Sequence, residues 1–278
     1  MKLGIMQGRL VPPEAGRFQS FPRAHWRDEF ALAAAAGLDT IEWIYDAYGE
    51  DVNPLATETG IVELDRLCRL HRVTVESVCA DWFMDFPLVG VDAESSRERW
   101  LRLAWLMRQC ACLKINRLVI PFVDASAIRD AEGAAGVVAG MKSLSDMIAK
   151  TNVELHLETS LSPQAFAALL AAIAHPRVKV NYDAGNSASL GFRAQDEFAA
   201  YGASVGSVHL KDRRKGAGTV PLGQGDTDFP ALFECLEAVN YAGDFILQVA
   251  RGTEGDELAW TRQNVQVARR WMQKLERP

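Results

Sequence analysis

Short apolar runs alternate with longer amphipathic segments along the whole chain. The runs are rich in β-branched and aromatic residues and predict eight strands, at residues 3–6, 40–45, 73–78, 117–123, 153–158, 178–183, 207–210 and 245–249. The segments between them show helical spacing: Trp26, Phe30 and Ala34 recur every four residues, and Gly37 then provides a stop signal. The pattern therefore predicts regular alternation of strand and helix.

Eight strand–helix units are the number that a closed parallel barrel needs. We therefore expect an α/β fold consisting of a single (β/α)8 TIM barrel, with residues 1–278 forming one domain, because no linker, repeat or low-complexity segment divides the chain. Loops that follow the strands form the active face of such barrels. The long first loop, residues 11–23, is therefore expected to cover the site.

Composition and charge restrict the classes of partner. The net charge of −6 and the pI near 5.5 argue against binding of a phosphate backbone, which requires a basic face. The N-terminus lacks a signal-peptide pattern, and the longest apolar run, residues 165–174, is too short to cross a bilayer. The five cysteines are an odd number and several lie in predicted helices, which is typical of reduced thiols. We expect a cytoplasmic protein that binds a small molecule, with no nucleic-acid or membrane partner.

Polar residues gather at the C-terminal ends of the predicted strands, where barrel enzymes carry their chemistry. In chain order they are Gln7, Arg9, Glu42, Glu76, Asp81, His156, Glu158, Asp183, Asn186, His209, Lys211, Asp212, Gln248 and Arg251. Three successive strands contribute Glu158, Asp183 and His209, one hard-metal ligand type each. The sequence therefore predicts a divalent-metal site.

Four segments carry a resemblance to a known family. They are HLETS (156–160), NYDAGNS (181–187), SVHLKDR (207–213) and the stretch from Gly218 to Leu247, and they resemble the xylose-isomerase-like barrel superfamily. Within it the chain looks like the sugar-phosphate isomerase and epimerase group, which includes hexulose-phosphate and xylulose-phosphate epimerases. The resemblance implies one divalent ion (Mn, Mg, Co or Zn), held by a Glu, an Asp, a His and a second Glu. These positions correspond to Glu158, Asp183, His209 and Gln248.

Gln248 departs from the family pattern. An amide oxygen can coordinate a hard cation, but it cannot accept a proton at neutral pH. Epimerases of this family use two glutamates on opposite faces of the substrate, so one face lacks its base here. Either Glu158 alone catalyses a one-base isomerisation, or another carboxylate substitutes, for which the candidates are Glu42, Glu76 and Asp212.

The remaining strand-end residues are candidate substrate contacts. We predict this role for Arg9, His156, Asn186, Lys211, Asp212, Arg214 and Arg251. The basic cluster at 211–215 has two interpretations, a solvated loop or a clamp for a phosphate or carboxylate.

The predicted function is metal-dependent isomerisation or epimerisation of a sugar or sugar phosphate, with Glu158 as catalytic base. Two alternatives stay open: a dehydratase acting on a polyol or keto acid, and a sugar-binding barrel with reduced catalysis. The three-zinc endonucleases of the superfamily need more histidines at strand ends than this chain, with five in all, provides. The resemblance is compatible with a homodimer or tetramer.

Overall fold

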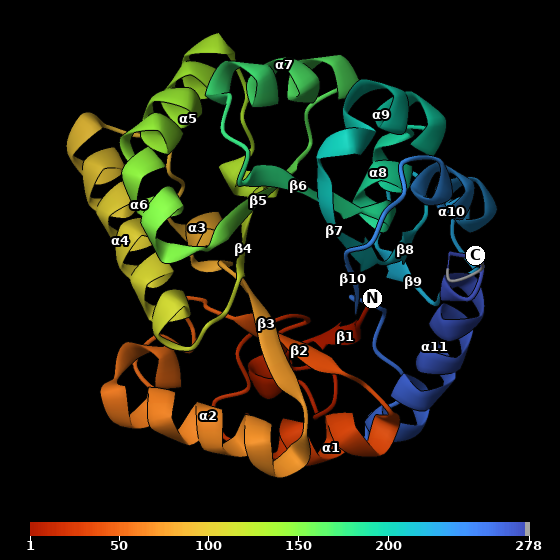
Figure 1. Ribbon diagram of the computed structural model, residues 1–278. Helices are drawn as coiled ribbons and strands as arrows, with labels where there is room; N and C mark the ends of the chain where they lie inside the picture. Colours follow the sequence, from red (N-terminus) through yellow and green to blue (C-terminus); the bar gives the residue numbers. More distant parts are fainter. Residues whose placement is uncertain (276–278) are drawn as a thin grey trace.

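The computed structural model describes residues 1–275 and shows a closed barrel of parallel strands with helices around it (Figure 1). Around the barrel the strands run in the order β1, β10, β7, β6, β5, β4, β3, β2. Their bounds are β1 Leu3–Met6, β2 Thr40–Ile44, β3 Thr74–Cys79, β4 Arg117–Phe122, β5 Glu154–Thr159, β6 Val178–Asp183, β7 Val205–Leu210 and β10 Asp244–Leu247. The predicted (β/α)8 barrel is confirmed, and each predicted strand matches an observed one to within a few residues.

Helices surround the strands and bury their apolar faces against the barrel. They are α1 Asp28–Ala36, α2 Glu58–His71, α3 Trp82–Asp85, α4 Ala93–Cys112, α5 Ala131–Ser143, α6 Ser145–Thr151, α7 Pro163–Ile173, α8 Ala184–Leu190, α9 Ala194–Tyr201, α10 Phe229–Ala238 and α11 Glu257–Met272. Side-chain oxygens cap several of them: Ser162 accepts from the N–H of Ala165 and Asp183 from that of Asn186. The end of α1 at Gly37 matches the predicted stop, because Gly37 adopts the left-handed conformation there.

The parallel register brings the predicted ligands to the same end of the barrel. Asp183 on β6 pairs directly with His209 on β7, and Glu158 lies near the end of the adjacent β5. Gln248 follows the last residue of β10, on the other side of β7. All four side chains therefore start from the C-terminal ends of four consecutive strands in the ring, as expected for a barrel of this kind.

Two irregular segments shape that end. The first loop, between β1 and α1, is held by the buried Glu29, whose carboxylate accepts the backbone N–H of Gly8 at 2.7 Å. After β7, strands β8 (Asp212–Arg213) and β9 (Thr219–Val220) form a short antiparallel hairpin.

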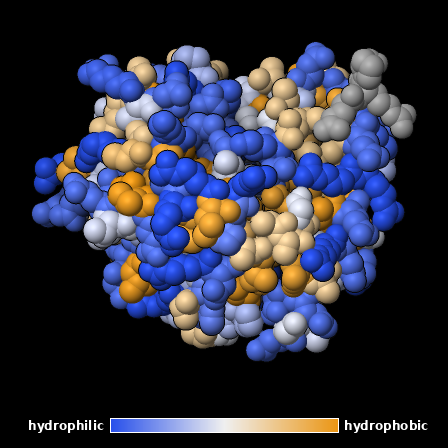
Figure 2. Space-filling view, turned by 60° about the horizontal axis from the view of Figure 1, so that its bottom comes forward, coloured by the Kyte–Doolittle hydropathy of each residue, from blue (hydrophilic) through white to orange (hydrophobic). Residues whose placement is uncertain are grey.

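The face of the molecule drawn in Figure 2 is mainly hydrophilic. On the face in Figure 2, hydrophobic residues are interspersed in small groups among charged and polar ones. Within residues 1–275, no helix combines the length and the apolar character needed to cross a membrane. The cytoplasmic location and the homodimer or tetramer remain predictions.

Candidate metal centre and substrate pocket

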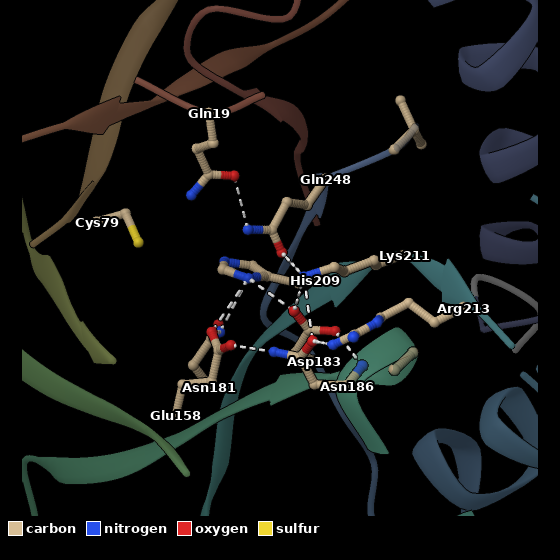
Figure 3. Close-up of polar contacts among 12 residues, drawn as sticks. Gln19, Cys79, Glu158, Asn181, Asp183, Asn186, His209, Lys211, Arg213 and Gln248 are labelled. Carbon is tan, nitrogen blue, oxygen red and sulfur yellow. Dashed lines mark hydrogen bonds and ion pairs between the residues drawn. The ribbon is translucent and has the colours of Figure 1, made fainter. Parts of the chain in front are cut away.

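Glu158, Asp183 and His209 converge as predicted. Each offers one ligand atom, and the three atoms lie within 4.8 Å of one another. His209 Nδ1 is 3.4 Å from a Glu158 oxygen and 3.9 Å from an Asp183 oxygen (Figure 3). Bonds of about 2.0–2.2 Å to a metal place ligand atoms on opposite sides of the ion up to roughly 4.4 Å apart, so small side-chain movements would let all three bind one ion.

A buried carboxylate fixes the orientation of His209. Glu42 accepts the Nε2 hydrogen of His209 at 2.7 Å and the hydroxyl of Ser77 at 2.7 Å, and neither His209 nor Glu42 is exposed. Burial alone would lower the pKa of His209, but the charge of Glu42 and the contacts with Asp183 and Glu158 raise it well above 6.5. The carboxylate binds Nε2 of His209, so Nδ1 is left to face Glu158 and Asp183. This is the usual arrangement of a metal-binding histidine.

Asn181 links the two ligands on either side of it. Its amide Nδ2 lies 2.9 Å from Glu158 and 3.1 Å from His209 Nδ1, while its oxygen accepts the hydroxyl of Ser207 at 2.6 Å. Ser207 in turn contacts His156 Nδ1 at 2.7 Å, and the other nitrogen of His156 lies 3.1 Å from Glu154. A chain of hydrogen bonds therefore runs through the barrel interior, from the metal ligands to the opposite end.

The side chain of Gln248 is hydrogen-bonded to Lys211. The ammonium of Lys211 donates to Asp183 at 3.2 Å, to Asn186 at 3.1 Å and to Gln248 Oε1 at 3.3 Å (Figure 3). Burial by itself would raise the pKa of Asp183, but the charge of Lys211 and the contact with His209 hold it well below its usual value. The donor set thus fits a divalent cation, with the Lys211 ammonium also bonded to two of its four expected ligands.

A pocket of about 330 Å³ opens beside these residues. It is lined by Arg17, Phe18, Gln19, Asp46, Tyr48, Cys79, Asp81, Met84, Asp85, Pro121, Val123, Asp124, Glu158, Asn186, Lys211, Arg213, Thr219 and Gln248. Residues 17–19 belong to the first loop, so the expectation that this loop covers the site is confirmed. The size of the pocket and its mixture of apolar and charged walls suit a small polar molecule.

Two of the predicted substrate contacts line the pocket, and the others lie elsewhere. Lys211 and Asn186 line it, and Asn186 Nδ2 donates to Glu158 at 2.6 Å. Arg9 and Arg251 instead hold the first loop: both donate to the carbonyl of Phe18, at 2.6 and 3.0 Å.

Three further placements need correction. His156 is fully buried one layer below Glu158, because residues two apart on a strand share a face but not a depth. Asp212 is also fully buried and accepts the backbone N–H groups of residues 223, 225 and 227. Arg214 is exposed outside the pocket, and its neighbour Arg213 lines it instead.

The candidates for a second base are all occupied elsewhere. Glu42 lies beneath the ligands as the partner of His209. Glu76 forms an ion pair with Lys2 and accepts Asn116 Nδ2 at 3.2 Å, away from the pocket. Asp212 stabilises the loop after β9, as described above. None of the three side chains lines the pocket.

The sequence interpretation missed Gln19 and Asn181 as parts of the site. Gln19 Oε1 accepts Nη2 of Arg9 and Nε2 of Gln248, both at 3.0 Å, and its Nε2 donates to Asp81 at 2.7 Å. Loop residues such as Gln19 carry no periodic signal. Asn181 could have been found, because it lies two residues before Asp183 on the same strand face.

Comparison with known proteins agrees with this geometry. A family model described as xylose isomerase-like TIM barrel matches residues 30–275. The L-ribulose-5-phosphate 3-epimerase UlaE of Shigella flexneri serotype 5b is 26% identical over 254 residues, covering 84% of this chain and 85% of that protein.

Solved structures share the fold at low identity. A D-psicose 3-epimerase determined in the presence of D-fructose superposes with a TM-score of 0.75, at 16% identity and 99% coverage of both chains. The IOLI protein with a bound zinc atom gives a TM-score of 0.74 at 16% identity, covering 99% of this chain and 98% of that one.

Proposed function

Because the chain belongs to the xylose isomerase-like TIM barrel family, we propose that it is a divalent-metal-dependent epimerase or isomerase of a ketose or ketose phosphate. The observation that carries the proposal is the convergence of Glu158, Asp183 and His209 within 4.8 Å beside a pocket at the active end of the barrel. The epimerase names of the relatives and the zinc atom in a structural neighbour support it.

In this proposal Glu158 removes a proton from the carbon next to the substrate carbonyl. One of its oxygens accepts from Asn181 and the other from Asn186, so two neutral amides orient the carboxylate, and His209 Nδ1 lies 3.4 Å from it. A divalent ion held by Glu158, Asp183, His209 and the Gln248 oxygen would polarise the carbonyl and stabilise negative charge on oxygen.

Three cations line the pocket and support recognition of an anionic group. Arg17 extends from the first loop, Lys211 lies beside the ligands, and Arg213 donates to Asn186 Oδ1 at 2.8 Å. Guanidinium groups suit a phosphate, so a phosphorylated ketose would place its phosphate toward Arg17 and Arg213.

A second candidate function rests on Lys211. Its ammonium contacts both Asp183 and Gln248, which supports a sugar-binding barrel with weak metal binding and reduced catalysis.

Metal analysis separates the two candidates. We expect wild-type protein purified without chelator to hold about one divalent ion per chain, and His209→Ala to lose it. His175→Ala is the matched control, because His175 lies outside the site, where its ring accepts the N–H of Arg177. Chelator should abolish epimerisation of L-ribulose 5-phosphate or D-psicose, and added Mn²⁺ should restore it. Wild-type protein that takes up no ion even after soaking with Mn²⁺ or Zn²⁺ would favour the binding-only barrel.

A further inference from the structure

An epimerase that inverts the configuration of a carbon with two bases needs a second acid–base group on the other face of the substrate. Gln248 cannot provide that group. Five carboxylates line the pocket: Asp46, Asp81, Asp85, Asp124 and Glu158. Asp85 and Asp124 are exposed to solvent at the edge of the pocket. Asp46 accepts the backbone N–H groups of Phe21 and Gly49 at 2.9 and 2.7 Å, so it is committed to loop structure.

Side chains hold the carboxylate of Asp81, whereas backbone N–H groups hold that of Asp46. Its two oxygens accept Gln19 Nε2 at 2.7 Å and the Cys79 thiol at 3.1 Å. The Gln19 amide has a fixed orientation, since its oxygen accepts from both Arg9 and Gln248. Gln19 therefore connects Asp81 directly to the amide that stands at the position of the family's second glutamate.

The environment of Asp81 brings the pKa of its carboxyl group close to neutral pH. Burial raises the pKa of Asp81 to about 6, and the negative charges of Asp46 and Glu158 add to the rise, while the hydrogen bonds from Gln19 and Cys79 oppose it. An acid–base catalyst works best when its pKa lies near the working pH.

The barrel places Asp81 and Glu158 on different walls of the pocket. Asp81 follows β3 and Glu158 ends β5, with β4 between them in the ring, and β10 with Gln248 lies beyond both. A substrate seated over the metal ligands would therefore meet Glu158 from one side and Asp81 from another.

We propose that Asp81 is the second acid–base residue, replacing the glutamate that Gln248 has displaced; this assignment rests on the proposed epimerase function. Glu158 takes the proton from the carbon next to the carbonyl, and the C–H electron pair forms the carbon–carbon double bond of an enediolate as the carbonyl electrons move to oxygen. Protonated Asp81 then gives its proton to the same carbon from the other wall, and the electrons return to restore the carbonyl. Glu158 ends as the acid and Asp81 as the carboxylate, and proton exchange with solvent resets both.

Proton exchange in heavy water tests the assignment. The probes are two pairs of C3 epimers: L-ribulose 5-phosphate with L-xylulose 5-phosphate, and D-psicose with D-fructose. Each is incubated with Mn²⁺-loaded enzyme in D₂O, and NMR follows C3 deuteration and epimer formation separately. The variants are Asp81→Asn, Glu158→Gln and, as matched control, Asp146→Asn, because Asp146 is exposed on α6 and does not line the pocket. Circular dichroism and metal content confirm that Asp81→Asn folds and binds Mn²⁺.

The two variants are expected to exchange the C3 proton of opposite epimers. Asp81→Asn should lose epimerisation by about 100-fold or more, yet still exchange the C3 proton of the one epimer that faces Glu158. Glu158→Gln should exchange only the other epimer, and Asp146→Asn should match wild type within about threefold.

Three results would overturn the assignment. One is Asp81→Asn epimerising within about threefold of wild type, which would leave the role to another group such as Lys211. Another is a wild-type enzyme that interconverts ketose and aldose, with Asp81→Asn unaffected, as one-base chemistry predicts. A wild type that neither exchanges nor epimerises any probe would refute the proposed function itself, which distinguishes the two failures.

Discussion

The contact between Glu42 and His209 gives the sharpest quantitative prediction. Glu42→Gln keeps an oxygen to accept the His209 N–H and keeps the size of the side chain, so the change removes only a charge. Both side chains are fully buried and 2.7 Å apart, so water does not screen the interaction. A hydrogen bond to a charged group is worth about 1.5–3 kcal/mol against about 0.5–1.5 kcal/mol for a neutral one. The midpoints of these ranges differ by about 1.3 kcal/mol, which corresponds to roughly tenfold weaker metal binding, at the lower end of the range for such outer partners.

Titration of metal-free protein with Mn²⁺, by calorimetry at several pH values, measures this effect. Since the pKa of His209 is raised, Mn²⁺ must displace a proton from it, and affinity should increase about tenfold per pH unit below that pKa. In Glu42→Gln the pKa of His209 should fall, so the increase should level off at lower pH and the tenfold loss should be largest at high pH.

Glu76→Gln is the matched control, because Glu76 occupies the neighbouring strand but pairs with Lys2 away from the ligands. An unchanged Mn²⁺ affinity and pH profile in Glu42→Gln would refute the reasoning. So would an equal loss in Glu76→Gln, which would point to a general effect of removing a carboxylate charge from this part of the barrel.

Three other outcomes follow from the same geometry. Lys211→Met should bind Mn²⁺ more tightly than wild type in the same titration, because no ammonium then competes for Asp183 and Gln248; equal or weaker binding would mean that Lys211 does not compete. Gln248→Glu should also tighten Mn²⁺ binding, by adding a carboxylate to the ligand set, and binding no tighter than wild type would exclude residue 248 from that set. Glu154 has a pKa lowered to about 2, since its contacts with His156 and Lys179 outweigh burial. Its contribution to stability should therefore be present above about pH 4.5 and lost toward pH 2, so that chemical denaturation of wild type and Glu154→Gln converges as the pH falls across that window; a constant difference would contradict it.

The barrel and the cluster of three candidate metal ligands could be predicted from the sequence, because both depend on repeating patterns. Strand spacing fixes the ring, and a polar residue at the end of an apolar run falls at the active end whatever the packing details. This is why Glu158, Asp183 and His209 were found together.

The errors came from depth and from loops, which periodicity does not encode. His156 shares a strand face with Glu158 but lies one layer lower, and Asp212 is used by a loop whose fold depends on glycines 223 and 225. Arg9 and Arg251 were expected at the substrate but bind backbone carbonyls of the first loop. In each case the residue type was compatible with a site, and only three-dimensional packing decided its partner.

The hydrogen-bonded chain through the barrel interior limits how this protein can diverge. Because Ser207 donates its hydroxyl hydrogen to Asn181 Oδ1, its oxygen must accept from His156 Nδ1, so the partners of Ser207 fix its role. Replacing one member leaves its neighbours without a hydrogen-bond partner, which costs about 1–3 kcal/mol for each buried group left unpaired. This is a large part of a total folding stability of about 5–15 kcal/mol. Members of the chain are therefore expected to be exchanged in sets rather than singly. Exposed rim residues such as Asp85 and Asp124 carry no such constraint, so new substrate preferences in descendants of this protein should arise at the rim while the floor of the site stays unchanged.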